Sequence, residues 1–327
     1  MTSRLRLTCV VFIGTLLIMT TPASAALPAG TPPRVLVGAH HSAAPRTAAP
    51  HTAMASFNRL ETAVGRLDVV HYYQAWGGAA GEWDRVRADG AAAGGRRVLL
   101  TWEPWDPAAG VSQPGYSHRA IVGGEHDAYL RRWAEGARDF GRPLELRLMH
   151  EMNGNWYPWA GGVSGNTAQS YVAAWRHVHG IFRDVGASNV RFVWSANADD
   201  VPAGNKMEPY YPGRTYVDLL ALDGYNWGVV QGKGTWRSYE QVFASSYARV
   251  TRLGPQQVWI TETASATSGG DKAGWVRAML ASRRFPRVTA LVWFDVVKER
   301  DWSLTSSAAV TRAFRDQRGL RRPLAAR

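Results

Sequence analysis

Cysteine is nearly absent from this sequence, and its absence limits what can stabilise the fold. Cys9 is the only cysteine among 327 residues, and it lies in the first apolar run of the chain. With one thiol the chain can form no internal disulfide. Stability must therefore come from the burial of apolar surface, which a single domain of roughly 300 residues can supply.

Long apolar runs are also scarce, since there is only one, at residues 7–19. Two non-adjacent arginines precede it, and an Ala-Ser-Ala cleavage signal ends at Ala25. This pattern is typical of a secretory signal peptide of the Sec type, because the run is too short for a comfortable membrane span. We expect residues 1–25 to be removed after Ala25 and 26–33 to form a short leader. The mature protein should be secreted and have no membrane segment.

Acidic residues are few relative to basic ones. Asp and Glu number 26 and Lys and Arg 38, so the net charge is +12, which becomes +10 without the two arginines of the signal peptide. There is no run of basic residues and no nucleic-acid-binding motif, so nucleic acid is excluded as a partner. The positive charge indicates either an ordinary solvated surface or adhesion to anionic cell-wall polymers. Residues 321–327 are expected to form a basic tail.

The chain has no internal repeat, low-complexity linker or appended binding module. Instead, short apolar runs alternate with longer amphipathic stretches, and Gly or Pro stands at most of the joins. The strand-like runs are residues 35–39, 69–73, 98–101, 144–149, 190–195, 219–223, 258–261 and 289–294. The clearest helix-like stretches are residues 53–64, 128–140, 171–185, 239–252 and 272–284.

Eight alternations of strand and helix predict an α/β fold, a (β/α)8 TIM barrel spanning residues 34–320 as a single catalytic domain. The fifth unit is the weakest, because residues 198–216 look like an irregular loop with at most a short helix. A doubly wound open sheet is the structural alternative. It is disfavoured because no Gly-rich phosphate-binding fingerprint follows the first strand.

One segment carries the strongest chemical signal. Residues 150–159 read His-Glu-Met-Asn-Gly-Asn-Trp-Tyr-Pro-Trp and follow the fourth strand-like run directly. Sugars stack their C–H faces on aromatic rings and bond their hydroxyls to amides and carboxylates, and cleavage of an acetal requires a proton donor. Glu151 provides one carboxyl group in this setting, and Glu262 provides a second after the seventh run. Two glutamates at strand ends of one barrel are the minimum equipment of a retaining glycosidase.

Several of these residues together resemble glycoside hydrolase family 26. The resemblance rests on His-Glu-Met-Asn-Gly at 150–154 with Trp156, on Asp-Gly-Tyr at 223–225, and on Thr-Glu at 261–262. Members of this family are endo-β-mannanases, mixed-linkage β-glucanases (lichenases) and β-1,3-xylanases. The resemblance implies a (β/α)8 barrel in which Glu151 is the acid/base and Glu262 the nucleophile. The strand count places these two residues after the fourth and seventh strands independently.

The resemblance also implies a substrate-binding surface. His150 would line the subsite of the cleaved sugar, Tyr225 would donate a hydrogen bond to the nucleophile, and Trp293 would be the aromatic floor. Tryptophans past strand ends are expected to be sugar platforms. The full set of predicted substrate-binding residues is His150, Asn153, Trp156, Tyr225, Trp293, Glu103, Trp102 and Trp227.

Two departures from the family pattern bear on the substrate. Glu103 falls near a position where many mannanases carry a histidine, and Trp293 is followed by Phe294 and Asp295, which looks more like the lichenase branch. The sequence therefore predicts a monomeric endo-β-glycanase that acts on a neutral β-linked polysaccharide, with β-mannan and mixed-linkage β-glucan both open. No metal or organic cofactor is required. The alternatives are a non-catalytic polysaccharide-binding protein on the same barrel and a hydrolase that remodels the producer's own envelope polysaccharide.

Overall fold

The computed structural model describes residues 35–41, 50–78, 81–230 and 234–320. The predicted signal peptide, leader and basic tail lie outside these described residues. Within them, no helix is both long and apolar enough to cross a membrane.

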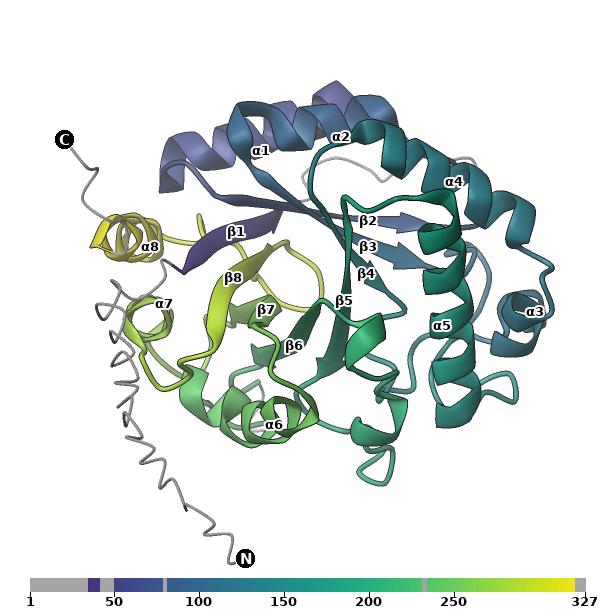
Figure 1. Ribbon diagram of the computed structural model, residues 1–327. Helices are drawn as coiled ribbons and strands as arrows, with labels where there is room; N and C mark the ends of the chain where they lie inside the picture. The colour runs from purple at the N-terminus through teal and green to yellow at the C-terminus, as the bar shows by residue number, and fades with distance from the viewer. Residues whose placement is uncertain (1–34, 42–49, 79–80, 231–233, 321–327) are drawn as a thin grey trace, which may run out of the picture. The chain divides into compact units, whose positions relative to one another are not determined.

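Parallel strands form a closed barrel in which each strand pairs with the next along the chain and the last pairs with the first. Helices lie around the outside of these strands (Figure 1). The predicted TIM barrel is therefore confirmed. The strands are β1 (Leu36–His41), β2 (Val69–Ala75), β3 (Arg97–Glu103), β4 (Leu144–Leu148), β5 (Val190–Asn197), β6 (Leu219–Asn226), β7 (Val258–Ser265) and β8 (Val288–Asp295).

The helices connect successive strands as the alternation predicted. They are α1 (Pro50–Val64), α2 (Arg85–Ala92), α3 (His118–Val122), α4 (Asp127–Phe140), α5 (Ala168–Val185), α6 (Tyr239–Leu253), α7 (Lys272–Ala281) and α8 (Ala308–Leu320). The weak fifth unit contains only 3₁₀ turns, at Glu208–Tyr210 and Arg214–Tyr216, as expected for residues 198–216. The sequence did not predict α2, because the residues that this helix buries are alanines, which give no clear apolar periodicity.

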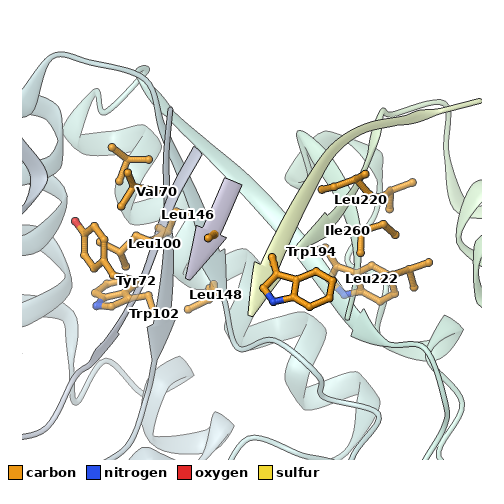
Figure 2. Close-up of a cluster of buried hydrophobic side chains, with 14 of the residues drawn as sticks. Val70, Tyr72, Leu100, Trp102, Leu146, Leu148, Trp194, Leu220, Leu222 and Ile260 are labelled. Atoms are coloured by element: carbon orange, nitrogen blue, oxygen red, sulfur yellow. The ribbon is translucent and has the colours of Figure 1, made fainter. Parts of the chain in front are cut away.

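Side chains alternate between the two faces of the barrel wall, as they must in a strand. Alanine, valine and leucine side chains fill the lower interior together with the larger ring of Trp259. The residues at the alternate strand positions point outward and pack against the helices. Figure 2 shows part of this outer layer, with Val70, Tyr72, Leu100, Trp102, Leu146, Leu148, Trp194, Leu220, Leu222 and Ile260. The barrel is therefore a packed core with its chemistry confined to one end.

Local sequence explains where the longer helices begin and end. Thr167 caps α5 in a reciprocal arrangement with Ser170, which satisfies backbone donors of the first turn. Gly141 and Gly186 end α4 and α5 with φ of 70° and 79°, a conformation that favours glycine. Because α4 and α5 end at these glycines, only short loops connect them to β4 and β5.

Several strands extend beyond their predicted ends. β6 continues to Asn226 and β7 to Ser265, and these two residues are register partners joined by a 2.8 Å hydrogen bond from Asn226 Nδ2 to Ser265 Oγ. The prediction stopped where apolar residues stopped, but polar side chains continue the ladder by pairing with one another. The residues expected after β6 and β7 therefore lie within the strand ends, which fixes their backbone.

Candidate active site

Glu262 lies near the mouth of the barrel and receives three hydrogen bonds. Tyr225 Oη donates to Oε2 at 2.5 Å, and Tyr73 Oη and Arg147 Nη2 both donate to Oε1. Burial raises the pKa of this carboxyl, but the surrounding groups, the Arg147 guanidinium foremost, outweigh burial and lower the pKa to about 2. Glu262 is therefore ionised at all ordinary pH values, as a nucleophile must be.

Arg147 on β4 is the centre of the network beneath the site. Its side chain is fully buried, and Nη1 lies 2.8 Å from Asp223 Oδ1 while Nε lies 2.7 Å from Thr101 Oγ1. One guanidinium thus joins Asp223 on β6 to Glu262 on β7. A planar fork of donors suits this double recognition better than an ammonium group would.

Asp223 is held by further partners on neighbouring strands. Its carboxylate accepts hydrogen bonds from Ser195 Oγ at 2.8 Å and from Thr261 Oγ1 at 2.7 Å. Burial raises the pKa of Asp223 to about 7, although Arg147 opposes the rise. A second carboxyl group close to Glu262 therefore has the opposite tendency, which gives the site two differently titrating acids below its surface.

Glu151 lies directly beyond β4 in a left-handed backbone conformation, with φ of 53°, and Met149 two residues before it has φ of 45°. Such values are uncommon for residues other than glycine and cluster at functional sites. The Glu151 amide donates to Ser195 O at 2.9 Å, which ties this turn to β5. The backbone is thus held in an unfavourable conformation that aims the Glu151 side chain at the mouth.

The carboxyl group of Glu151 is only slightly exposed and accepts a 2.8 Å hydrogen bond from Trp156 Nε1. Burial first, and then the negative charges of Asp223 and Glu262, raise its pKa well above the ordinary range. The Trp156 hydrogen bond and Arg147 act in the opposite direction but are weaker. An upward shift of this pKa suits a general acid, which has to hold its proton until the leaving group takes it.

Gly154 explains the glycine of the His-Glu-Met-Asn-Gly motif. A Cβ at this position would lie 2.5 Å from the Trp156 ring, which is closer than side-chain atoms approach one another. We expect Gly154→Ala to displace the Trp156 indole from Glu151 and to lower kcat on polysaccharide by about 10-fold or more, in line with the effect of misplacing catalytic groups. Gly115→Ala is a suitable control, since a Cβ there meets nothing within 4 Å. Equal kcat values for the two variants would contradict the role given to Gly154.

Three other predicted residues lie at the mouth. His150 is buried with Nε2 3.1 Å from Tyr157 Oη and 3.9 Å from Glu262 Oε1, and burial lowers its pKa well below the ordinary value, so the ring is neutral. Glu103, the last residue of β3, accepts a 3.3 Å hydrogen bond from Trp105 Nε1. Trp227 is 46% exposed, which leaves its ring available as a platform.

Two predicted platforms are wrong. Trp102 and Trp293 are 0% and 1% exposed, because strand alternation turns both rings outward into the helix layer. Trp102, labelled in Figure 2, stacks on Trp133 at 4.3 Å. Trp293 packs edge-on against Trp275 at 5.9 Å and donates its Nε1–H to the Trp302 carbonyl at 2.8 Å. Neither ring can contact a substrate at the mouth.

The interior position expected for Trp293 is held by its neighbour. Phe294 stacks on His40 with ring centroids 5.3 Å apart and meets Tyr225 edge-on at 5.8 Å. Trp302, from the segment after β8, lies 5.1 Å from Trp227 and 5.2 Å from Tyr225. Phe294, Tyr225 and Trp227 therefore form the aromatic side of the mouth, and Trp302, which is 1% exposed, supports the rings of Tyr225 and Trp227. Sequence reasoning assigned neither Phe294 nor Trp302.

Asn153 is also misassigned as a substrate-binding residue. Its side chain is fully buried, and its amide nitrogen donates to Asn197 O at 2.9 Å and to Asp200 Oδ1 at 3.0 Å. Its amide oxygen accepts from Asn197 N at 2.8 Å. With both ends of the amide engaged, Asn153 fastens the turn after β4 to the end of β5.

Tyr73 and Arg147 are two further residues of the site that the sequence analysis did not single out. Both contact Glu262, and a usable signal existed for Arg147. It alternates with Glu145 between the leucines of β4, so the two charged residues share the interior face. Arg97 and Arg191 pair with Glu145 at the lower end of the barrel, which leaves Arg147 for the upper end. In the part of the chain that the structure describes, no group of three or more His, Cys, Asp or Glu could hold a metal ion.

Comparison with known proteins agrees with this geometry. Residues 117–280 match the family model described as Glycosyl hydrolase family 26. Endoglucanase H of Acetivibrio thermocellus is 39% identical over 82% of this chain, although the match spans 29% of that protein's length. Mannan endo-1,4-beta-mannosidase of Bacillus subtilis is 25% identical over 60% of this chain and 51% of its own.

Solved structures show the same fold at low sequence identity. The catalytic domain of a Bacillus sp. JAMB-750 GH26 endo-beta-1,4-mannanase superposes with a TM-score of 0.64 at 17% identity, covering 87% of this chain and 85% of that one. The Bacillus subtilis mannanase man26 gives a TM-score of 0.62 at 20% identity, covering 86% and 85%. The match to the family model and the strand-end glutamates lead to one conclusion: the chain belongs to glycosyl hydrolase family 26.

Proposed function

We propose that this protein is a retaining endo-β-glycanase that hydrolyses a neutral β-linked polysaccharide by double displacement. The observation that carries the proposal is the opposite direction of the pKa shifts of the two glutamates, in a site where Glu262 accepts three hydrogen bonds and Glu151 is buried beside Trp156. The pKa of Glu151 is raised and that of Glu262 is lowered to about 2. Two carboxyl groups whose environments separate their pKa values in this way are the acid and the nucleophile of a glycosidase.

In the first step, Glu262 attacks the anomeric carbon while Glu151 gives its proton to the glycosidic oxygen that leaves. The product is a covalent glycosyl-enzyme, and Tyr225, Tyr73 and Arg147 hold the attacking carboxylate in place beforehand. In the second step, Glu151, now ionised, takes a proton from water as the water attacks the same carbon and releases Glu262. Two inversions at one carbon give net retention.

For the substrate we propose a β-glucan, mixed-linkage glucan in particular, with β-mannan as the second candidate. The relative named Endoglucanase H shares 39% of residues over most of this chain. Relatives named mannan endo-1,4-beta-mannosidase match shorter parts of this chain at 25% to 31% identity, and they support mannan as the second candidate substrate. Glucose and mannose differ in the orientation of one hydroxyl, so a single polar side chain near the cleaved sugar can separate them.

The polysaccharide would be met outside the cell, as the Sec-type segment at the N-terminus implies. The same N-terminal segment is compatible with remodelling of the producer's own envelope polysaccharide, and the net positive charge supports this second role. A purely binding role is disfavoured, because a binder needs neither a raised pKa at Glu151 nor a lowered one at Glu262. Polymer recognition alone would be served by the exposed ring of Trp227 and its neighbours.

The deciding experiment is product analysis after incubation with lichenan, glucomannan-free β-mannan, β-1,3-xylan, cellulose and xylan, using Glu262→Ala as the inactive control. We expect internal cleavage of lichenan, with mannan cut more slowly. The anomeric proton signals of the first product, followed by NMR, should show the β anomer before mutarotation. An initial α anomer would exclude retention, and cleavage of no polysaccharide would favour the binding role.

Hydrolysis should also survive exhaustive chelation. Glu151 and Glu262 supply acid and nucleophile from the chain itself, and the described residues hold no cluster suited to a metal ion. We expect kcat and KM in excess EDTA to equal those of the untreated protein within error. Loss of activity that a divalent ion restores would show that the mechanism lacks a component.

A further inference from the structure

A second group of polar side chains lies on the opposite side of the barrel wall from the two glutamates. At the seam between β1 and β8, His40 and Phe294 face the interior, so the register partners His41 and Asp295 face outward. Ser56, on α1, meets them there. Three residues from three separate elements are thus brought together by the alternation of the strands and by the packing of α1.

Hydrogen bonds connect the three side chains in the order Asp295, His41, Ser56. Asp295 Oδ2 lies 2.6 Å from His41 Nδ1, and His41 Nε2 lies 2.8 Å from Ser56 Oγ. The other oxygen of Asp295 accepts the Leu304 amide at 2.5 Å, which anchors the carboxylate. A carboxylate at Nδ1 places the histidine proton on that nitrogen, so Nε2 is left to accept the Ser56 hydroxyl proton. This is the arrangement of nucleophile, base and orienting acid that activates serine in hydrolases of unrelated folds.

Ser56 is 3% exposed, and a pocket adjoins it. Ser56 and His41 line a pocket of about 270 Å³ together with Arg59, Leu60 and Thr305. Asp295 is 1% exposed and the His41 side chain 17%, so the acid is covered while the base reaches the pocket. Leu60 offers an apolar surface, and Arg59, one helical turn beyond Ser56, offers N–H donors. A pocket of this size has room for a small acyl group.

We propose that Ser56, His41 and Asp295 form a second hydrolytic site, which cleaves esters of short-chain carboxylic acids. Ser56 Oγ attacks the acyl carbon as its proton passes to His41 Nε2, and Arg59 stabilises the negative charge on the carbonyl oxygen. The C–O bond to the alcohol then breaks, and the alcohol leaves with the proton from His41. Water, deprotonated by the same nitrogen, releases the acid and restores Ser56. This site uses neither Glu151 nor Glu262 and does not depend on the proposed glycanase activity.

The test has to separate a reactive serine from a hydrogen-bonded brace between β1, β8 and α1. The full chain is treated with a fluorophosphonate, and the modified peptide is identified by mass spectrometry. p-Nitrophenyl acetate, butyrate and octanoate are assayed in parallel. We expect the label on Ser56 and faster hydrolysis of acetate and butyrate than of octanoate. Ser56→Ala should take no label, and its ester hydrolysis rate should fall by at least about 100-fold, the lower range for removal of an acid–base or nucleophilic group.

Ser246→Ala is the matched control, because Ser246 is also a buried helical serine but donates to the Phe243 carbonyl rather than to a histidine. It should keep both the label on Ser56 and the ester rate. His41→Gln should lose both, while its glycanase activity and that of Ser56→Ala stay at the wild-type level, which shows that the barrel is intact. A wild-type chain that takes no label on Ser56, or a Ser56→Ala variant with the wild-type ester rate, would overturn the proposal.

Discussion

Glu262→Ala is expected to abolish hydrolysis of every substrate, with kcat lowered by at least about 10⁴-fold, because removal of the nucleophile from a catalytic group that acts as a unit leaves little activity. Tyr73, Arg147 and Tyr225 all direct their donors at this one carboxylate, and no other acid receives that set of contacts. The loss should be equal on polysaccharide and on an activated aryl glycoside, since both need the covalent intermediate. Initial rates on both substrates measure it. Azide added to Glu262→Ala should give the inverted glycosyl azide.

Glu151→Ala is the contrasting half of this prediction. It removes protonation of the leaving group, so sugars should suffer most and an activated aryl leaving group least. Its glycosyl-enzyme should accumulate, since the general base for the second step is also missing, and azide should rescue that step with retained product. The basic limb of the pH profile should disappear from glycosylation, because that limb reports loss of the proton from Glu151, whose pKa burial raises. Wild-type rates on polysaccharide for Glu151→Ala would refute the assignment.

Arg147→Met is expected to move the acidic limb of the kcat/KM profile to higher pH. Burial on its own raises the pKa of Glu262, and Arg147 is the largest of the groups that reverse this and lower the pKa to about 2. Without the guanidinium, the nucleophile is protonated over part of the range in which the wild type is active. The measurement is kcat/KM on an aryl glycoside between pH 3 and pH 8, a range chosen around the ordinary carboxyl pKa.

The same substitution should lower the free energy of unfolding by about 3–5 kcal/mol, as for other buried pairs that lose one partner. In the wild type, the lowered pKa of Glu262 adds stability above the carboxyl's unfolded pKa, and this is lost as pH falls through about 2. In Arg147→Met, burial acts unopposed by Arg147, so this contribution should shrink or change sign. Arg191→Met is the control, because Arg191 pairs with Glu145 at 3.6 Å, away from Glu262. An acidic limb shared by all three proteins would contradict the role of Arg147.

The sequence was sufficient for the barrel and for its two glutamates because both leave local signals. Each strand has an apolar run bounded by Gly, Pro or polar residues, and Glu151 and Glu262 directly follow such runs. Tyr225 was also identified as the donor to Glu262, and the structure places it there at 2.5 Å. The order of elements along the chain, with the rule that strand ends of a barrel meet at one mouth, was enough for the fold and the two glutamates. The role of Tyr225 came from the resemblance to family 26.

The failures concern side-chain direction. Trp102 and Trp293 were read by their proximity to strand ends, but their parity along β3 and β8 turns them outward, and the neighbouring Phe294 faces the site instead. Counting alternate positions back from the strand end would have corrected both. Parity alone would have failed at β7, where the register with β8 shifts between Ile260 and Thr263. Thr261 and Glu262 both reach partners across the interior, because an irregular strand can re-aim a side chain.

The pairing of β1 with β8 has a consequence for how the protein is made. Leu36 is the register partner of Ala290 and His41 of Asp295, so the seam of the barrel joins segments from opposite ends of the described chain. During synthesis the outer edge of β1 has no partner until β8 emerges, and such long-range closure is slow to form. The nascent chain is therefore an open sheet with an unpaired edge, the state most prone to wrong association. A chain truncated before Val288 would lack β8, so the outer edge of β1 would stay unpaired. We therefore expect that no N-terminal fragment ending before Val288 folds on its own.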